Sequence, residues 1–144
     1  MFKKILVPLD LTERHGAALQ AAAHLARANQ GEVILLHVVE LIAGLDGDEE
    51  SAFYQRLARR ARDHLAKLGS KLTREHIGWQ AEVLFGNRAV DTAGFAAERQ
   101  ADLIVLTSPL FQPERPTAGL GSMTWRISLI ATCPVLLVKD FLSR

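Results

Sequence analysis

The last third of the chain reads Ala101-Asp102-Leu103-Ile104-Val105-Leu106-Thr107, then a loop, then Gly119-Leu120-Gly121-Ser122, then a short helical pattern, and finally Cys133-Pro134-Val135-Leu136-Leu137-Val138-Lys139. The two apolar runs have the length of buried strands, and the glycine turn between them precedes a helix. Free backbone N–H groups and the Ser122 hydroxyl at such a helix start are suited to hold an anion such as a phosphate.

The rest of the chain alternates between apolar runs and segments of helical periodicity. Thr12 is the expected N-cap of the first helix, and Gln30-Gly31 is expected to end it. The predicted strands are Lys3–Leu9, Val33–Val39, Trp79–Phe85, Leu103–Thr107 and Pro134–Val138, and the predicted helices are about Glu13–Asn29, Glu50–Leu72, Arg88–Arg99 and Gly121–Ala131. This alternation predicts an α/β fold, a doubly wound parallel sheet of five strands with helices on both faces.

Composition excludes several classes of protein. With 144 residues, 49% of them hydrophobic, the chain is expected to form one domain over residues 1–144 with a substantial core. Its apolar runs are too short to span a membrane, and no secretory signal is recognised. A single cysteine excludes an internal disulfide, so a cytoplasmic location is expected. The near balance of 17 basic and 16 acidic residues argues against nucleic acid as a partner.

Several of these segments together resemble the universal stress protein family. The segments Ala101–Val105, Gly121-Ser122 and Cys133–Val138 are similar to the C-terminal signature of that family. Lys3–Asp10 and Glu32–Val39 are similar to its first two strands. The resemblance implies a flavodoxin-like sheet of strand order 3-2-1-4-5. Its topological switch point then lies between the first and fourth strands, where ligands of such sheets bind.

In the nucleotide-binding branch of that family, a Gly-x-x-Gly pair follows the fourth strand and Gly-Ser or Gly-Thr comes nine residues later. Here the pair's positions hold Ser108 and Phe111, in a loop (Ser108–Leu120) that also contains three prolines. Glycines let bare backbone approach phosphates, whereas prolines remove N–H donors. The loop is therefore expected to be a poorer phosphate cradle.

Part of the family's binding site is retained in the sequence. The resemblance places Asp10 near the base and ribose, with Pro8 in the same turn, and the Val38 backbone at the adenine. It places Gly121-Ser122 at the phosphates, with Thr107, Ser108 and Phe111 at the altered edge. A purely structural role is open for each: Asp10 in the following turn, Gly121-Ser122 as turn and N-cap, and Val38 in the core.

Three functions stay open. The chain is expected to be a dimeric, non-enzymatic stress-response regulator with a weakened or remodelled nucleotide crevice; alternatives are retained binding of ATP or another adenine nucleotide, and an interaction module without a small ligand. An altered loop could also fit a less charged ligand, with Phe111 stacking on a ring.

No histidine spacing predicts a metal site, and Ser122 lacks the sequence context of a nucleophile. His24 and His37 are expected to be hydrogen-bonded structural histidines, and Cys133 inert.

Two surfaces are candidates for partners. The apolar fifth strand is expected at a sheet edge, where bare strands pair with other chains. The resemblance implies a homodimer through its Val135, Leu136, Leu137 and Val138. Trp125 and Leu129 share a helix face because they are four residues apart, with Met123, Ile127 and Ile130 expected to be buried. Either the preceding loop covers Trp125 and Leu129, or they bind a protein partner.

Overall fold

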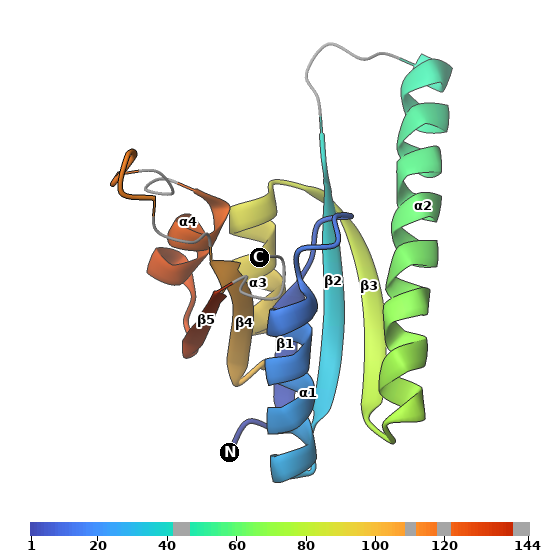
Figure 1. Cartoon of the computed structure of the whole chain (residues 1–144). Helices are drawn as coiled ribbons and strands as arrows, with labels where there is room; N and C mark the ends of the chain where they lie inside the picture. Colours follow the sequence, from blue (N-terminus) through green and yellow to red (C-terminus); the bar gives the residue numbers. More distant parts are fainter. Residues whose placement is uncertain (42–46, 109–111, 118–121, 140–144) are drawn as a thin grey trace.

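The computed structural model describes residues 1–41, 47–108, 112–117 and 122–139, with the side chains of residues 47–49 left out. Strands and helices alternate strictly along the chain (Figure 1). The elements are β1 (Lys4–Pro8), α1 (Gly16–Asn29), β2 (Glu32–Glu40), α2 (Gly47–Arg74), β3 (Gly78–Gly86), α3 (Arg88–Glu98), β4 (Leu103–Ser108), α4 (Met123–Ile130) and β5 (Val135–Lys139).

The five strands form one parallel sheet of order β3-β2-β1-β4-β5, so the predicted fold class and strand order are confirmed. In the centre of the sheet, Ile5 of β1 lies opposite Val33 of β2 on one side and Leu103 of β4 on the other. β3 and β5 form the two edges, as the sequence predicted. The carboxyl ends of β1 and β4 therefore lie side by side at the switch point.

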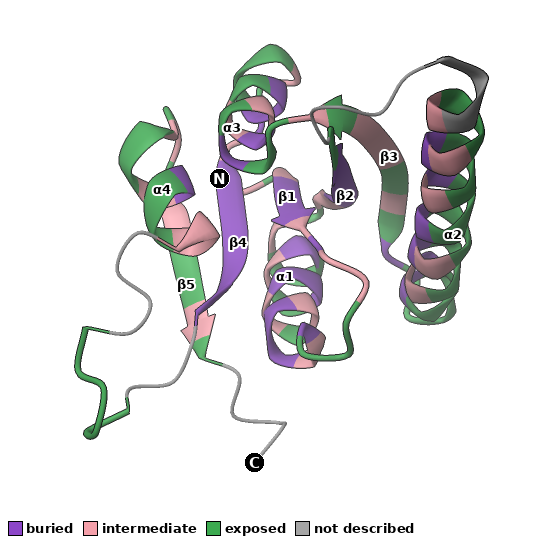
Figure 2. Cartoon of the chain, turned by 90° about the horizontal axis from the view of Figure 1, so that it is seen from above, coloured by how far each residue is buried: buried purple, intermediate pink, exposed green. Residues whose placement is uncertain are grey.

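Helices cover both faces of the sheet (Figure 2). On one face, the alanine-rich stripe of α1 and the leucines of α2 pack on alternate strand residues such as Val7 and Leu35. On the other face, α3 and α4 pack on the intervening residues, such as Leu6 and Leu36. Burial on both faces explains why the central strands are apolar without alternation.

The first helix begins later than the sequence predicted, at Gly16 rather than about Glu13, and its N-cap residue is His15 rather than Thr12. The reason is local. The Thr12 backbone N–H and hydroxyl both donate to Oδ1 of Asp10, which holds residues 10–12 in a turn instead of a cap. The left-handed residue that ends α1 is Gln30 (φ 55°), just before Gly31.

Three other expectations need correction. Ser108 is the last residue of β4 and is buried, so it does not begin the loop. Ile130 is 46% exposed and does not belong to the buried stripe of α4, which consists of Ile127 with a partly buried Met123. His24 lies on the exposed side of α1 and has no structural role in the core.

Candidate functional site at the switch point

A small crevice opens where β1 and β4 end, at the position that the topology predicted. Its volume is about 80 Å³. The apolar lining comes from strand ends and from α4, including Leu36, Val38 and Ile127, and the polar lining comes from the β1–α1 turn, α3, β4 and α4. The polar residues are Asp10, Arg14, His15, Arg88, Thr92, Thr107 and Thr124.

Both oxygens of the Asp10 carboxylate have partners within the chain. Its Oδ1 accepts from the Thr12 N–H (2.9 Å), the Thr12 hydroxyl and His15 Nε2 (2.7 Å). Its Oδ2 lies 3.0 Å from the Arg14 guanidinium. Burial by itself would raise the pKa of Asp10, but the hydrogen bonds from Thr12 and His15 outweigh it and hold the pKa well below its ordinary value. Asp10 is therefore a carboxylate at neutral pH.

His15 joins that carboxylate to β4. The ring is buried, with Nε2 facing Asp10 Oδ1 and Nδ1 2.7 Å from Oγ1 of Thr107. Because an ionised carboxylate only accepts, Nε2 carries a proton and donates it, and in a neutral ring Nδ1 accepts from the Thr107 hydroxyl. One imidazole thereby ties the turn after β1 to the end of β4, directly at the switch point.

A second histidine stabilises the same turn from β2. His37 Nδ1 donates to the carbonyl of Leu9 at 2.7 Å, and the ring is buried. Burial lowers the pKa of His37, although the hydrogen bond to Leu9 works in the opposite direction. The expected structural role of His37 is confirmed.

Two arginines bring positive charge to the crevice. Arg14 contacts Asp10, and Arg88, at the start of α3, lies 3.9 Å from Glu40 at the end of β2. Both residues line the crevice, and neither was identified from the sequence, nor was His15. The sequence offered only a weak indication of these residues. Arg14 and His15 follow Asp10 within five residues, but the pattern there predicts the first turn of a helix.

Of the residues predicted for the site, Pro8, Asp10, Val38 and Thr107 line the crevice together. Ser108 does not, because its hydroxyl accepts from Lys139 Nζ (3.0 Å) at the β4–β5 edge. Ser122 does not line it either. Its Oγ accepts from the Trp125 N–H as the N-cap of α4, so its structural role is present. Phe111 and Gly121 lie outside the described residues.

Asp10, His15 and Thr107 are hydrogen-bonded in the order carboxylate, imidazole, hydroxyl, which is also the order found in nucleophilic triads. Here the Thr107 side chain and backbone are only 6% exposed, and its carbonyl accepts from the Thr124 hydroxyl at 2.9 Å. We therefore assign this chain of hydrogen bonds a positioning role. Within the described ranges, no group of three or more His, Cys, Asp or Glu residues is arranged to hold a metal ion.

The match to a known family extends over nearly the whole chain. The model of the Universal stress protein family matches residues 1–139. The chain belongs to the universal stress protein family. Among curated universal stress proteins, YxiE of Bacillus subtilis (strain 168) is 30% identical over 154 residues, covering 96% of this chain and all of YxiE. MJ0531 of Methanocaldococcus jannaschii is also 30% identical, over 96% of this chain and 83% of its own length.

Solved structures share the universal stress protein fold. The hypothetical protein MJ0577 superposes with a TM-score of 0.79 at 24% identity, covering 96% of each chain. The universal stress protein from Archaeoglobus fulgidus in complex with dAMP has a TM-score of 0.71 at 24% identity, covering 96% of this chain and all of that one. A universal stress protein in complex with cAMP has a TM-score of 0.69 at 16% identity, covering 94% and 96%. In the part of this chain that is described, no helix is both long and apolar enough to cross a membrane.

Proposed function

We propose that this universal stress protein is a cytoplasmic, non-enzymatic stress-response regulator whose switch-point crevice binds adenine nucleotides only weakly, because it has been remodelled. The observation that carries the proposal is the Asp10–His15–Thr107 chain of hydrogen bonds. It occupies the crevice with groups of the protein itself and leaves about 80 Å³ of space.

The engaged carboxylate supports weak binding. A ribose hydroxyl that donates to Oδ1 of Asp10 has to compete with the hydrogen bonds from Thr12 and His15, and one that donates to Oδ2 has to share that oxygen with Arg14. Exchanging one satisfied hydrogen bond for another gains little free energy.

Other features of the crevice favour an adenine nucleotide as the residual ligand. Val38, Leu36 and Ile127 offer an apolar surface to a planar base, and Arg14 and Arg88 supply positive charge for a phosphate. Relatives of the same fold have been solved in complex with dAMP and with cAMP. We propose that any hydrolysis of ATP here is slow and incidental.

We also propose that two copies associate through β5. Leu136 and Leu137 are exposed on this edge strand, and the neighbouring α4 exposes Trp125 and Leu129, by 45% and 64%. Because Trp125 and Leu129 are exposed, the alternative in which they bind a partner is favoured over coverage by the preceding loop. This surface also supports the second candidate function, an interaction module.

The test is calorimetric titration of the protein with ATP, ADP and AMP in the presence of Mg²⁺. We expect weak binding, with a Kd near 1 mM, which corresponds to about −4 kcal/mol. A Kd below about 1 μM would contradict the remodelled crevice. No response to any of the three nucleotides by folded protein would leave the interaction module as the better function.

A loop variant tests whether the loop after β4 also weakens nucleotide binding. Replacing Phe111→Gly restores one of the glycines expected in this loop, and we expect the affinity for ATP to rise at least tenfold. Gln112→Gly is the matched control, because it adds a glycine to the same loop without removing the Phe111 ring, and should leave the affinity unchanged. Equal affinities of all three proteins would show that the loop does not limit binding.

A further inference from the structure

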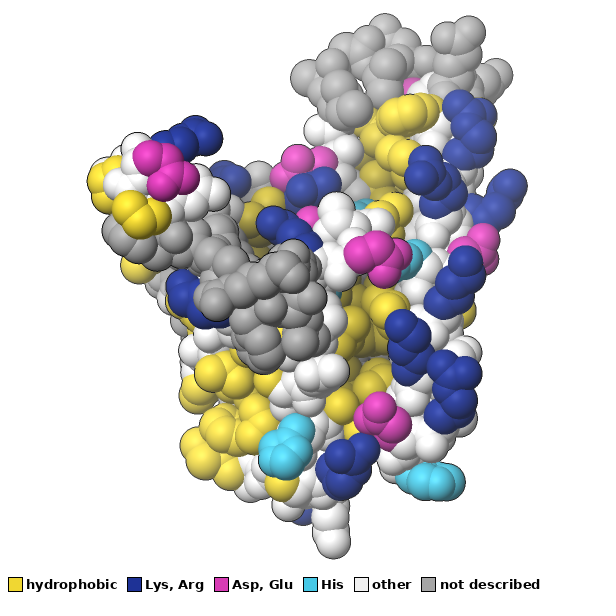
Figure 3. All heavy atoms as spheres, in the orientation of Figure 1, with side chains coloured by type: hydrophobic (Ala, Val, Ile, Leu, Met, Phe, Trp, Pro, Cys, Tyr) yellow, Lys and Arg dark blue, Asp and Glu magenta, His cyan; other side chains and the backbone are white. Residues whose placement is uncertain are grey.

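A second cavity lies away from the switch-point crevice, in a groove between α1 and α2. Its volume is about 470 Å³, within the range of small-molecule sites. Figure 3 shows a hollowed apolar strip between the two helices, with Lys and Arg side chains along α2. We propose that this α1–α2 groove binds an amphipathic carboxylate, a molecule with an unbranched apolar body and one anionic head.

The floor of the groove is apolar because of how the two helices meet the sheet. α1 turns its small residues toward the strands, which brings Leu19 and Ala23 to the side that faces α2. α2 contributes Leu68 and Leu72. Leu19 and Leu68 are only partly buried, so apolar surface remains to be covered by a ligand.

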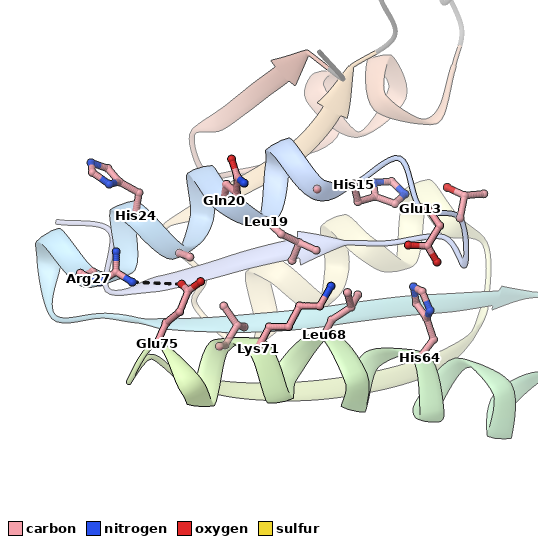
Figure 4. Close-up of a pocket in the computed structure, with 14 residues that line it drawn as sticks. Glu13, His15, Leu19, Gln20, His24, Arg27, His64, Leu68, Lys71 and Glu75 are labelled. Atoms are coloured by element: carbon pink, nitrogen blue, oxygen red, sulfur yellow. Dashed lines mark hydrogen bonds and ion pairs between the residues drawn. The ribbon is translucent and has the colours of Figure 1, made fainter. Parts of the chain in front are cut away.

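The groove is elongated, and an ion pair bridges one of its ends. Arg27 of α1 and Glu75, just after the end of α2, form an ion pair at 3.2 Å across that end (Figure 4). His64 of α2, eleven residues before Glu75, lies at the other end of the groove, as does Glu13. At 1.5 Å per residue the span is about 16 Å, which suits an extended chain better than a compact ring system.

The charges select the head group. Arg27 and Glu75 compensate each other, and Glu13 lies at the far end of the groove. Lys71 extends from α2 toward the α1 side in the middle of the groove, and within the described residues its ammonium group has no ion pair or hydrogen bond (Figure 4). An unpaired ammonium group above an apolar floor fits a carboxylate on an apolar chain, with the chain lying over Leu19, Leu68 and Leu72.

The groove inference does not depend on nucleotide binding. His15 lines both cavities. Of the residues that line the groove, His15 and Thr12 contact the Asp10 carboxylate, and the others do not. Failure of one proposal would therefore leave the other standing, and the two are separated experimentally by the ligand that is used.

The test is calorimetric titration with dodecanoate below its micelle concentration. We expect saturable binding at one site per chain, and weaker binding of octanoate because a shorter chain covers less apolar surface. Lys71→Met keeps the length of the side chain and removes the charge, so the affinity for dodecanoate should fall at least tenfold while dodecanol binds equally to both proteins. Lys67→Met is the matched control on the same helix, outside the groove, and should bind dodecanoate as the parent does.

A second variant keeps the result interpretable. Leu68→Glu places a carboxylate on the half-buried floor and should abolish dodecanoate binding, while thermal unfolding verifies that the variant is folded. Absence of saturable binding to the parent protein, or equal affinity in the parent and Lys71→Met, would overturn the proposal. So would saturation of the groove by an amphipathic helical peptide together with no response to dodecanoate.

Discussion

Asp10 and His15 form the pair on which the interpretation of the switch point depends. The imidazole satisfies the carboxylate on one side and the Thr107 hydroxyl on the other, both at 2.7 Å. Removal of the ring would leave a partly buried carboxylate and a buried hydroxyl with one partner fewer each. His15 thus both stabilises the turn after β1 and restricts access to Asp10.

Replacement of His15 by alanine should lower the free energy of unfolding. We expect a loss of about 1–2 kcal/mol, because two hydrogen bonds of a buried ring disappear and one of them is to a charged group. Urea unfolding of the parent and of the variant at neutral pH measures the difference. His24→Ala, an exposed position of α1, is the control and should change stability by less than about 0.5 kcal/mol. Equal values for the two variants would contradict the structural role of His15.

His37 should make stability depend on pH. Its pKa in the folded protein lies below the ordinary value of 6.5, because burial disfavours the charged ring. Below pH 6.5 the unfolded chain therefore binds a proton that the folded chain does not, and the free energy of unfolding falls as the pH falls. His37→Gln retains a donor for the Leu9 carbonyl but cannot titrate. Denaturant unfolding between about pH 7 and pH 5 should show a shallower decline for the variant, whereas an identical decline would contradict this assignment.

At the scale of elements, hydrophobic periodicity and strand-length apolar runs sufficed to predict all nine helices and strands of the described chain, with boundaries differing by a few residues. The start of α1 was predicted too early because Thr12 has the residue type of an N-cap. Hydrogen bonds inside the turn determine where the helix begins, because Thr12 donates to Asp10 instead of capping the helix. Such competition between two hydrogen-bonding patterns is invisible in residue type alone.

The packing of α2 on β3 depends on a glycine in the helix. A Cβ atom at Gly69 would lie 2.3 Å from the Trp79 ring, whose Nε1 donates to the Thr73 hydroxyl at 2.7 Å. In an open helix position, Gly→Ala stabilises by up to about 1 kcal/mol. At Gly69 we expect the opposite, a loss of about 1–3 kcal/mol from overpacking against the indole.

Gly94 of α3 provides the matched comparison, since a Cβ there would meet nothing within 4 Å. Gly94→Ala should therefore raise the melting temperature while Gly69→Ala lowers it. Tryptophan fluorescence, recorded with Trp125→Phe in both proteins so that Trp79 is the emitter, reports whether the ring has moved in the second variant. A stabilising Gly69→Ala would show that the indole does not restrict this position.

At the scale of the whole molecule, the two sheet edges differ. β3 is flanked by α2, whereas β5 carries exposed leucines and adjoins the exposed face of α4. An apolar edge strand of this kind favours association with a second copy. The proposed dimer would bury Leu136 and Leu137 of both copies.

Leu137→Lys should convert the proposed dimer into a monomer. The side chain is 45% exposed in the single chain, so a lysine is accommodated without loss of the fold, but two buried ammonium groups would oppose pairing across a two-fold axis. Sedimentation velocity over a range of concentrations measures the outcome. Val90→Lys, at a position of α3 that is 61% exposed and away from β5, is the control and should stay dimeric. A parent protein that sediments as a monomer at all concentrations would contradict the dimer.

The position of the candidate site could be predicted from the sequence, but its internal chemistry could not. Parallel topology alone brings the ends of β1 and β4 together, which is why Asp10 and Thr107 meet as expected. The bridge between them is made by His15, which is 92 residues from Thr107 along the chain. Nothing in the pattern around an isolated histidine specifies a partner at that distance. The same holds for Arg88 of α3, because the pattern around it does not indicate that it lines the crevice.

The affinity for ATP of the parent protein and of His15→Ala, measured side by side by calorimetry with Mg²⁺ present, tests most directly whether the chain's own groups occupy the crevice. Removing the imidazole takes away one of the three partners of Asp10 Oδ1 and enlarges the space beside Thr107. We expect weak binding by the parent and at least tenfold tighter binding by the variant, with His24→Ala unchanged. Tight binding of ATP by the parent protein would contradict the remodelled site. So would an affinity that does not rise when His15 is replaced.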